Sequence, residues 1–145
     1  MRRLISALTA LLLANYLAAC QPRALSVADP WARPASAGSN GAVYFVIDNP
    51  TNQADRLLSA SSNIAEHVEL HISVMDEQGT MGMHHQEEGV EVPARTKVAF
   101  EPGGLHVMLV DLPQDLQEGD NFPLTLTFQN AGEIQLDVTV KESGD

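Results

Sequence analysis

Histidine and methionine side chains are concentrated in one part of this chain. All five histidines, and every methionine after the first residue, fall between residues 67 and 108. They are His67, His71, Met75, Met81, Met83, His84, His85, His106 and Met108. Imidazole binds copper in either oxidation state, whereas the soft, neutral thioether favours Cu(I) over zinc, magnesium or calcium. The cluster therefore predicts a site for one Cu(I) ion.

The spacing of two of these residues predicts half of that site. His106 and Met108 are separated by one residue on an expected strand, so both side chains project from one face, about 6 to 7 Å apart at Cα. Val107 and Leu109 point the other way, into the expected core. This phase makes His106 and Met108 the exposed pair.

A second group of ligand types lies earlier in the chain. Met81 and Met83 repeat the same spacing, in what we expect to be a polar loop just after a turn. His71 ends an apolar strand at the point where this loop begins. A strand end, a loop and a second strand are thus expected to converge at the rim of the fold.

The remaining histidines and Met75 have simpler interpretations. His67 shares a face with His71 but lies about 13 Å away along a strand, so we expect a surface histidine. His84 and His85 form either a weak Cu(II) site or solvated loop residues. Met75 is expected to be a partly buried loop residue or a spare thioether.

The elements that must hold these residues are β-strands. Residues 41–47, 65–72, 97–100, 106–112, 122–128 and 133–140 are short runs rich in valine, leucine, isoleucine, threonine and phenylalanine, separated by turn residues. Alternating apolar residues on both sides of Asn130-Ala131-Gly132 predict a hairpin with one buried face. No convincing helical period follows the first twenty residues, so we expect an all-β antiparallel sandwich.

Composition narrows the classes of partner. The chain has 8 lysine and arginine residues against 19 aspartate and glutamate residues. Without Arg2 and Arg3, which fall in a segment we expect to be removed, the net charge is 6 minus 19, or −13. Such a surface repels phosphate backbones, so we expect no nucleic-acid partner. A single cysteine excludes an intrachain disulfide and a multi-thiolate metal site.

The N-terminal residues predict export and lipid anchoring. Arg2 and Arg3 precede a short apolar run, as in a secretory signal peptide of residues 1–19. The sequence Leu17-Ala18-Ala19-Cys20 resembles the lipobox of bacterial lipoproteins, in which the cysteine is acylated after cleavage. Residues 20–25 would then be a lipid-anchored tether and residues 26–145 the folded domain. Gln21, in place of aspartate, favours the outer membrane, so we expect a periplasmic protein held there.

Longer motifs resemble the bacterial periplasmic copper chaperones of PCu(A)C type. The resemblance runs through residues 28–33, 41–44, 49, 68–71, 81–83, 102–109 and 123–128, which is nearly the whole mature chain. It implies a cupredoxin-like fold, a rim-exposed Cu(I) site and a role in carrying copper toward cytochrome oxidase. It also implies the ligands His71, Met83, His106 and Met108.

The chain departs from the family pattern in three places. Ile72 stands where many members have a methionine, which removes an optional thioether. The interval from Met83 to His106 has one residue more than the commonest spacing, which leaves Met81 as an alternative to Met83. The chain also lacks a tail rich in histidine and methionine, so no second copper site of that kind is expected.

The expected function is a monomeric copper carrier that passes its ion to a thiolate-bearing acceptor, such as an oxidase assembly factor or oxidase subunit. A metal-free β-sandwich lipoprotein acting as an interaction module is the alternative from another class, and copper storage or tolerance is the third. An enzyme is not expected, because the chain has no nucleophilic cysteine, Gly-x-Ser-x-Gly elbow or His-Glu-x-x-His pair. Trp31, Arg33 and the acidic residues Glu87, Glu88 and Glu91 are expected to be structural or solvated.

Overall fold

The computed structural model describes residues 23–144, and this part of the chain forms ten β-strands. They are β1 (Ser26–Ala32), β2 (Gly41–Asn49), β3 (Asp55–Ser61), β4 (His67–Met75), β5 (Met81–His85), β6 (Val90–Val92), β7 (Thr96–Phe100), β8 (Leu105–Val110), β9 (Asn121–Phe128) and β10 (Gly132–Val140). The predictions for the signal segment and Cys20 lie outside the described residues. Within residues 23–144 there is no helix, and hence none that could span a membrane.

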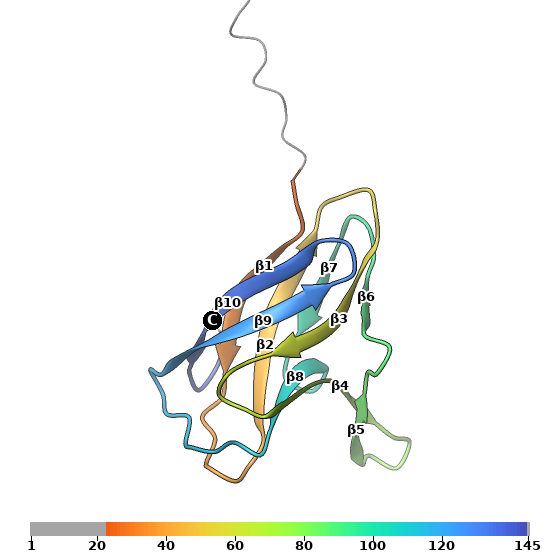
Figure 1. The fold of residues 1–145 in the computed structure, drawn as a ribbon. Coiled ribbons are helices and arrows are strands. Elements are labelled where there is room, and N and C mark those ends of the chain that lie inside the picture. Colours follow the sequence, from red (N-terminus) through yellow and green to blue (C-terminus); the bar gives the residue numbers. More distant parts are fainter. Residues whose placement is uncertain (1–22, 145) are drawn as a thin grey trace, which may run out of the picture.

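The strands form one curled sheet that folds into two packed layers. Their order is β5-β4-β8-β7-β2-β1-β10-β9-β3-β6, with a further pairing of β8 with β2. Figure 1 shows β9 and β10 in front of β2, β7 and β8, with β5 beside the lower end of the sandwich. Most pairs are antiparallel, as expected, but β1 with β10 and β7 with β8 are parallel. The predicted all-β sandwich is confirmed.

The core fills the space between the layers with alternating apolar side chains. Phe45 of β2 stacks on Phe100 of β7, with ring centroids 4.4 Å apart. In the opposite layer, Leu124 and Leu126 of β9 are fully buried. Leu126 lies opposite Ile134 in the β9–β10 hairpin, as its alternating sequence predicts. Each such buried side chain contributes about 1.5–3 kcal/mol to the stability of the fold.

Strand β1 joins the two layers. It pairs with β2 on one side and with β10 on the other, and its register with β2 shifts between Ala28 and Trp31. Asp29 has φ of 54° in this bulge, and Pro30, which lacks an N–H, occupies the shifted position. The bulge redirects the strand so that Trp31 and Ala32 are paired on both sides.

Four strands were not expected from the sequence: β1, β3, β5 and β6. Strand β5 matters most for the candidate metal ligands, because the prediction of a loop at Met81 and Met83 is wrong. The prediction that His71 ends its strand is also wrong, since β4 continues to Met75. The segment between β4 and β5 is a tight turn, and the two strands form a hairpin at the edge of the sheet.

Candidate metal centre

Three neighbouring strands place the ligand types on one face of the sheet. In β4, His71 is directly opposite His106 of β8 on one side and His85 of β5 on the other. Because side chains alternate along a strand, the residues two positions away share this face. Two residues from His71 along β4, Glu69 lies opposite Met108 in one direction and Ser73 lies opposite Met83 in the other. The opposite face of β4 and β8 carries the buried side chains Leu70, Val107 and Leu109.

His106 is held with one nitrogen available to a metal. Its Nδ1 lies 3.1 Å from the backbone oxygen of Gly104. A carbonyl oxygen only accepts, so Nδ1 carries the proton and the lone pair of the neutral ring is on Nε2. Burial, aided by the neighbouring His71, lowers the pKa of His106 and outweighs the opposing hydrogen bond to Gly104. The ring is therefore neutral at pH 7, which is the form that binds metal.

His71 is oriented by a carboxylate. Its Nε2 lies 2.7 Å from Oε2 of Glu69, and this hydrogen bond holds the pKa of Glu69 below its ordinary value. A carboxylate accepts only, so Nε2 is the donor and the lone pair of neutral His71 is on Nδ1. That Nδ1 is buried and has no hydrogen-bond partner. A buried acceptor without a partner is costly, and a metal ion bound there would satisfy it.

The two rings are spaced as ligands of one ion would be. The ring centroids of His71 and His106 are 5.9 Å apart, with planes inclined at 39°. An imidazole nitrogen lies about 2 Å from a bound first-row metal, which puts each centroid about 3.1 Å from it and two centroids at most about 6.3 Å apart. Within residues 23–144 no three His, Cys, Asp or Glu side chains converge as a metal site. On the same face, the thioethers of Met83 and Met108 are available to complete a site built on this pair.

Met108 lies on the expected face but is not exposed. Only 9% of Met108 and 5% of His106 is accessible to solvent, so the prediction that they form the exposed pair is wrong. Asn40 reaches across from the turn before β2, and its Nδ2 lies 3.6 Å from the Met108 sulfur. A thioether sulfur has two lone pairs, so this contact leaves one for a metal. This half of the candidate site is covered.

The other methionines are exposed on the β4–β5 hairpin. Met83 is 59% accessible, and Met81 and Met75, which lie opposite each other farther along the hairpin, are 51% and 62% accessible. Met75 is thus neither in a loop nor partly buried, contrary to expectation. In register, Met83 is two residues from the row of His71 and Met81 is two residues further. This order favours Met83 over Met81 as a ligand beside His71.

The structure separates His84 from His85, which the sequence left as a pair. The ring of His85 lies parallel to that of His71 within 14°, with centroids 5.2 Å apart. His84 falls on the opposite face of β5, opposite Ile72. His85 lies two residues after Met83, so the two side chains share a face if this segment is a strand. That spacing is the feature of the sequence that could have identified His85. His67 is exposed, as expected.

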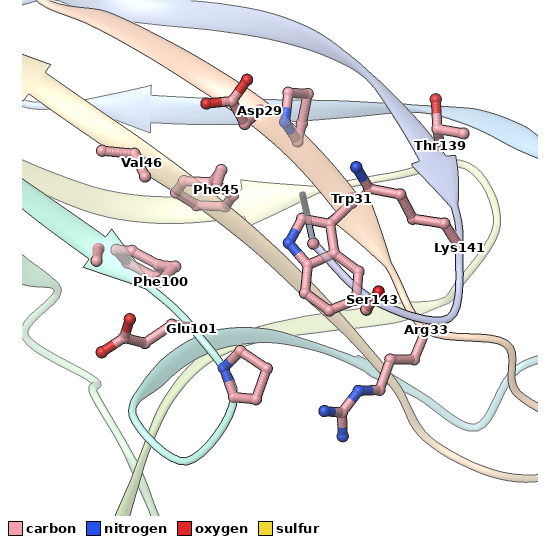
Figure 2. Close-up of a pocket in the computed structure, with 14 residues that line it drawn as sticks. Asp29, Trp31, Arg33, Phe45, Val46, Phe100, Glu101, Thr139, Lys141 and Ser143 are labelled. Atoms are coloured by element: carbon pink, nitrogen blue, oxygen red, sulfur yellow. The ribbon is translucent and has the colours of Figure 1, made fainter.

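A large groove lies elsewhere on the molecule. It has a volume of about 790 Å³ and is formed by β1, β2, β7 and the chain end after β10. Figure 2 shows Trp31 in this groove, with Arg33 beside it. Trp31 packs on Tyr44, with ring centroids 4.7 Å apart, and the Arg33 guanidinium lies 5.8 Å from the Tyr44 ring. No histidine or methionine lines this groove, so it is not the metal centre.

The acidic residues expected to be solvated are exposed in the structure. Glu87 and Glu88 lie in the turn after β5, while Glu91 lies on β6, a strand that the sequence did not predict. All three have accessible side chains, and their hard carboxylate oxygens suit Cu(I) poorly.

The ten strands define a cupredoxin-like β-sandwich that carries histidine and methionine side chains on one face of β4, β5 and β8. The chain belongs to the family described as "Putative lipoprotein LpqE-like", which matches residues 25–140. A curated relative, the uncharacterized protein RP573 of Rickettsia prowazekii (strain Madrid E), is 33% identical over 126 residues. That match covers 84% of this chain and 68% of the relative.

Solved structures share the fold. The copper-bound PCuAC domain from PmoF2 is 26% identical with a TM-score of 0.67, covering 85% of this chain and 97% of that domain. The solution structure of CuI-DR1885 from Deinococcus radiodurans is also 26% identical, with a TM-score of 0.64, covering 90% of this chain and 87% of that one. The predicted cupredoxin-like fold and PCuAC-type family are thus confirmed.

Proposed function

We propose that this chain is an extracytoplasmic carrier of one Cu(I) ion, which it passes to an acceptor protein. The observation that carries the proposal is the pair of oriented imidazoles, with His71 Nδ1 buried and without a partner beside the neutral His106. Two solved structures of the same fold are described as copper-bound and as CuI-DR1885, which supports copper as the ion.

The proposed ligands are His71, Met83, His106 and Met108. The imidazoles supply Nδ1 of His71 and Nε2 of His106, as their hydrogen bonds to Glu69 and Gly104 require. Met108 supplies a covered thioether and Met83 an exposed one. Two nitrogens with two neutral sulfurs suit Cu(I), whereas zinc prefers nitrogen, thiolate and carboxylate ligands.

The acceptor is proposed to bind Cu(I) through thiolates. Thiolate binds Cu(I) more strongly than thioether or imidazole, so the ion can pass by ligand exchange without an energy source. The proposed setting is the periplasm, and the proposed role is the supply of copper for cytochrome oxidase assembly. The chain would act as a monomeric carrier rather than as an enzyme.

The test is a competition titration for Cu(I) against a chromophoric chelator. The wild type should bind one ion, and Met83→Leu and Met108→Leu should each weaken binding at least tenfold, which is about 1.4 kcal/mol. His71→Ala and His106→Ala should weaken it at least as much. Met75→Leu is the matched control, because it removes a thioether from the same face without affecting a proposed ligand.

Three other outcomes would redirect the proposal. If Met81→Leu weakens binding more than Met83→Leu does, Met81 is the ligand and the register near β5 differs. If the wild type binds no Cu(I), or none of these substitutions matters, the metal-free interaction module is the better function. Copper that stays on the protein for hours against a stronger stoichiometric acceptor would instead indicate storage or tolerance.

A further inference from the structure

The proposed site has one covered side and one open side. His106 and Met108 are almost fully buried on β8, so an incoming ligand cannot reach the ion from there. The open side is the edge strand β5, which pairs with β4 alone. A carrier must release its ion, and ligand exchange requires the acceptor to touch the ion before the last donor leaves. Release should therefore proceed through β5.

His85 is the side chain of β5 that contacts a proposed ligand. Its ring centroid lies 5.2 Å from that of His71, within the limit of about 6.3 Å for two imidazoles on one ion. The other neighbour of His71, His106, also satisfies this limit at 5.9 Å. His71 lies between the two in register, so its distance to either ring is short enough for a shared ion.

His85 also faces solvent. It is exposed, and it lines two shallow grooves of about 390 and 420 Å³. The first groove is walled by Glu66, His67 and Glu69, and the second by Arg56 and the turn after β5. The two carboxylates give the first groove a negative wall that attracts a cation. An acceptor side chain can thus approach an ion at His85, whereas it cannot approach one at His106.

We propose that His85 is a transient Cu(I) ligand through which the ion leaves the proposed site. His71 keeps its bond to Cu(I) while His85 adds to the ion as His106 and the thioethers dissociate. The ion, then held by His71 and His85, is exposed to an acceptor thiolate. Only neutral lone-pair donors bind or dissociate until the thiolate binds, so copper stays Cu(I) and no electron is transferred. This proposal rests on the Cu(I) carrier function above.

The test compares His85→Ala with His84→Ala. His84 is the matched control, because it is an exposed histidine in the same strand but on the opposite face. Both variants should bind Cu(I) at equilibrium within threefold of wild type. In stopped-flow transfer of Cu(I) to a synthetic dithiol peptide, His85→Ala should be at least tenfold slower than wild type, and His84→Ala should match wild type.

Two further variants of His85 separate ligand chemistry from local structure. His85→Met restores a soft donor and should recover most of the transfer rate, whereas His85→Phe, which keeps a flat ring without a donor, should stay slow. Thermal unfolding of each apo-protein checks that β5 is intact.

Failure of the proposal for His85 can be distinguished from failure of the carrier function. Equal transfer rates for wild type and His85→Ala would overturn the proposal, as would a tenfold loss of equilibrium affinity, which would make His85 a resting ligand. A wild type that binds no Cu(I) would instead remove the carrier function itself.

Discussion

Glu69 determines which nitrogen of His71 can bind an ion. Without the carboxylate 2.7 Å from Nε2, the neutral ring could carry its proton on either nitrogen. One of these two tautomers would present the lone pair on Nε2 instead of Nδ1. The carboxylate selects one tautomer of His71 in the absence of any metal. His106 receives the complementary constraint from a backbone carbonyl, so the two rings present different nitrogens, Nδ1 and Nε2.

This role predicts a large effect of Glu69→Ala on copper binding. Loss of such an orienting partner typically weakens metal binding about 10- to 100-fold, so we expect at least tenfold weaker Cu(I) binding. Glu69→Gln should lose less, because its amide oxygen can still accept from Nε2. Nitrogen-15 NMR of the apo-protein should show His71 protonated at Nε2 and His106 at Nδ1, with the His71 tautomer mixed in Glu69→Ala.

Glu66→Ala is the control for general electrostatics. It removes a carboxylate from the same groove wall without touching the ring of His71. If both alanine variants weaken Cu(I) binding equally, Glu69 acts by charge alone and the positioning role is wrong.

At the scale of the element, strands with regular alternation were predictable and the irregular ones were not. In β9 and β10, apolar residues alternate without interruption, because one face is buried along the whole hairpin. β5 has the sequence Met81-Gly82-Met83-His84-His85, with no β-branched residue and no buried side chain. It is a strand because β4 offers an unpaired edge, which is a tertiary effect that no local pattern records.

The same limit applies to the candidate site. His106 and Met108 could be placed on one face from spacing alone, since they share a strand. Their burial could not be predicted from spacing, because it depends on Asn40, which lies 68 positions from Met108 along the chain. The contact of His85 with His71 likewise needs the register of the β4–β5 hairpin. The ligand types were therefore visible in the sequence, and the covered and open sides of the site were not.

Asp55 at the start of β3 ties that strand to the β9–β10 turn. Its carboxylate accepts hydrogen bonds from the backbone N–H groups of Asn130 at 2.9 Å and Ala131 at 2.8 Å, and from that of Arg56 at 2.7 Å. Burial opposes the charged form, but these hydrogen bonds outweigh it and lower the pKa of Asp55. Because hydrogen bonds to a charged group are worth about 1.5–3 kcal/mol each, the contact is a strong local constraint.

We therefore predict that Asp55→Asn lowers the free energy of unfolding by about 2 kcal/mol at pH 7, measured by urea denaturation. Since the folded pKa lies below the unfolded value of about 3.9, the stabilisation by Asp55 is complete above that value and is lost as pH falls toward the folded pKa. The difference between wild type and Asp55→Asn should shrink over this acidic range. Asp137→Asn, at an exposed position of β10, is the control; an equal loss there would contradict the prediction.

At the scale of the whole molecule, charge and tether set where the carrier can act. The expected net charge of −13 keeps the domain away from anionic lipid and attracts cations to it. Six residues of expected tether, 20–25, span at most about 20 Å when fully extended. If the domain is anchored in this way, it stays near the membrane, and the proposed acceptor is expected to present its copper ligands close to the same surface.

The anchor itself is predicted to be a lipid on Cys20, and two substitutions test it. Several acyl chains hold a protein at a bilayer firmly, since each buried CH₂ contributes about 0.8 kcal/mol, and Cys20→Ser removes the only thiol that could carry them. We expect Cys20→Ser to take up no labelled fatty acid and to remain uncleaved or to leave the membrane fraction. Gln21→Asp is the matched partner: it should stay labelled but move from the outer to the inner membrane fraction. Wild type that incorporates no labelled fatty acid would overturn the lipid anchor, whereas labelled wild type already in the inner membrane fraction would overturn only its predicted location.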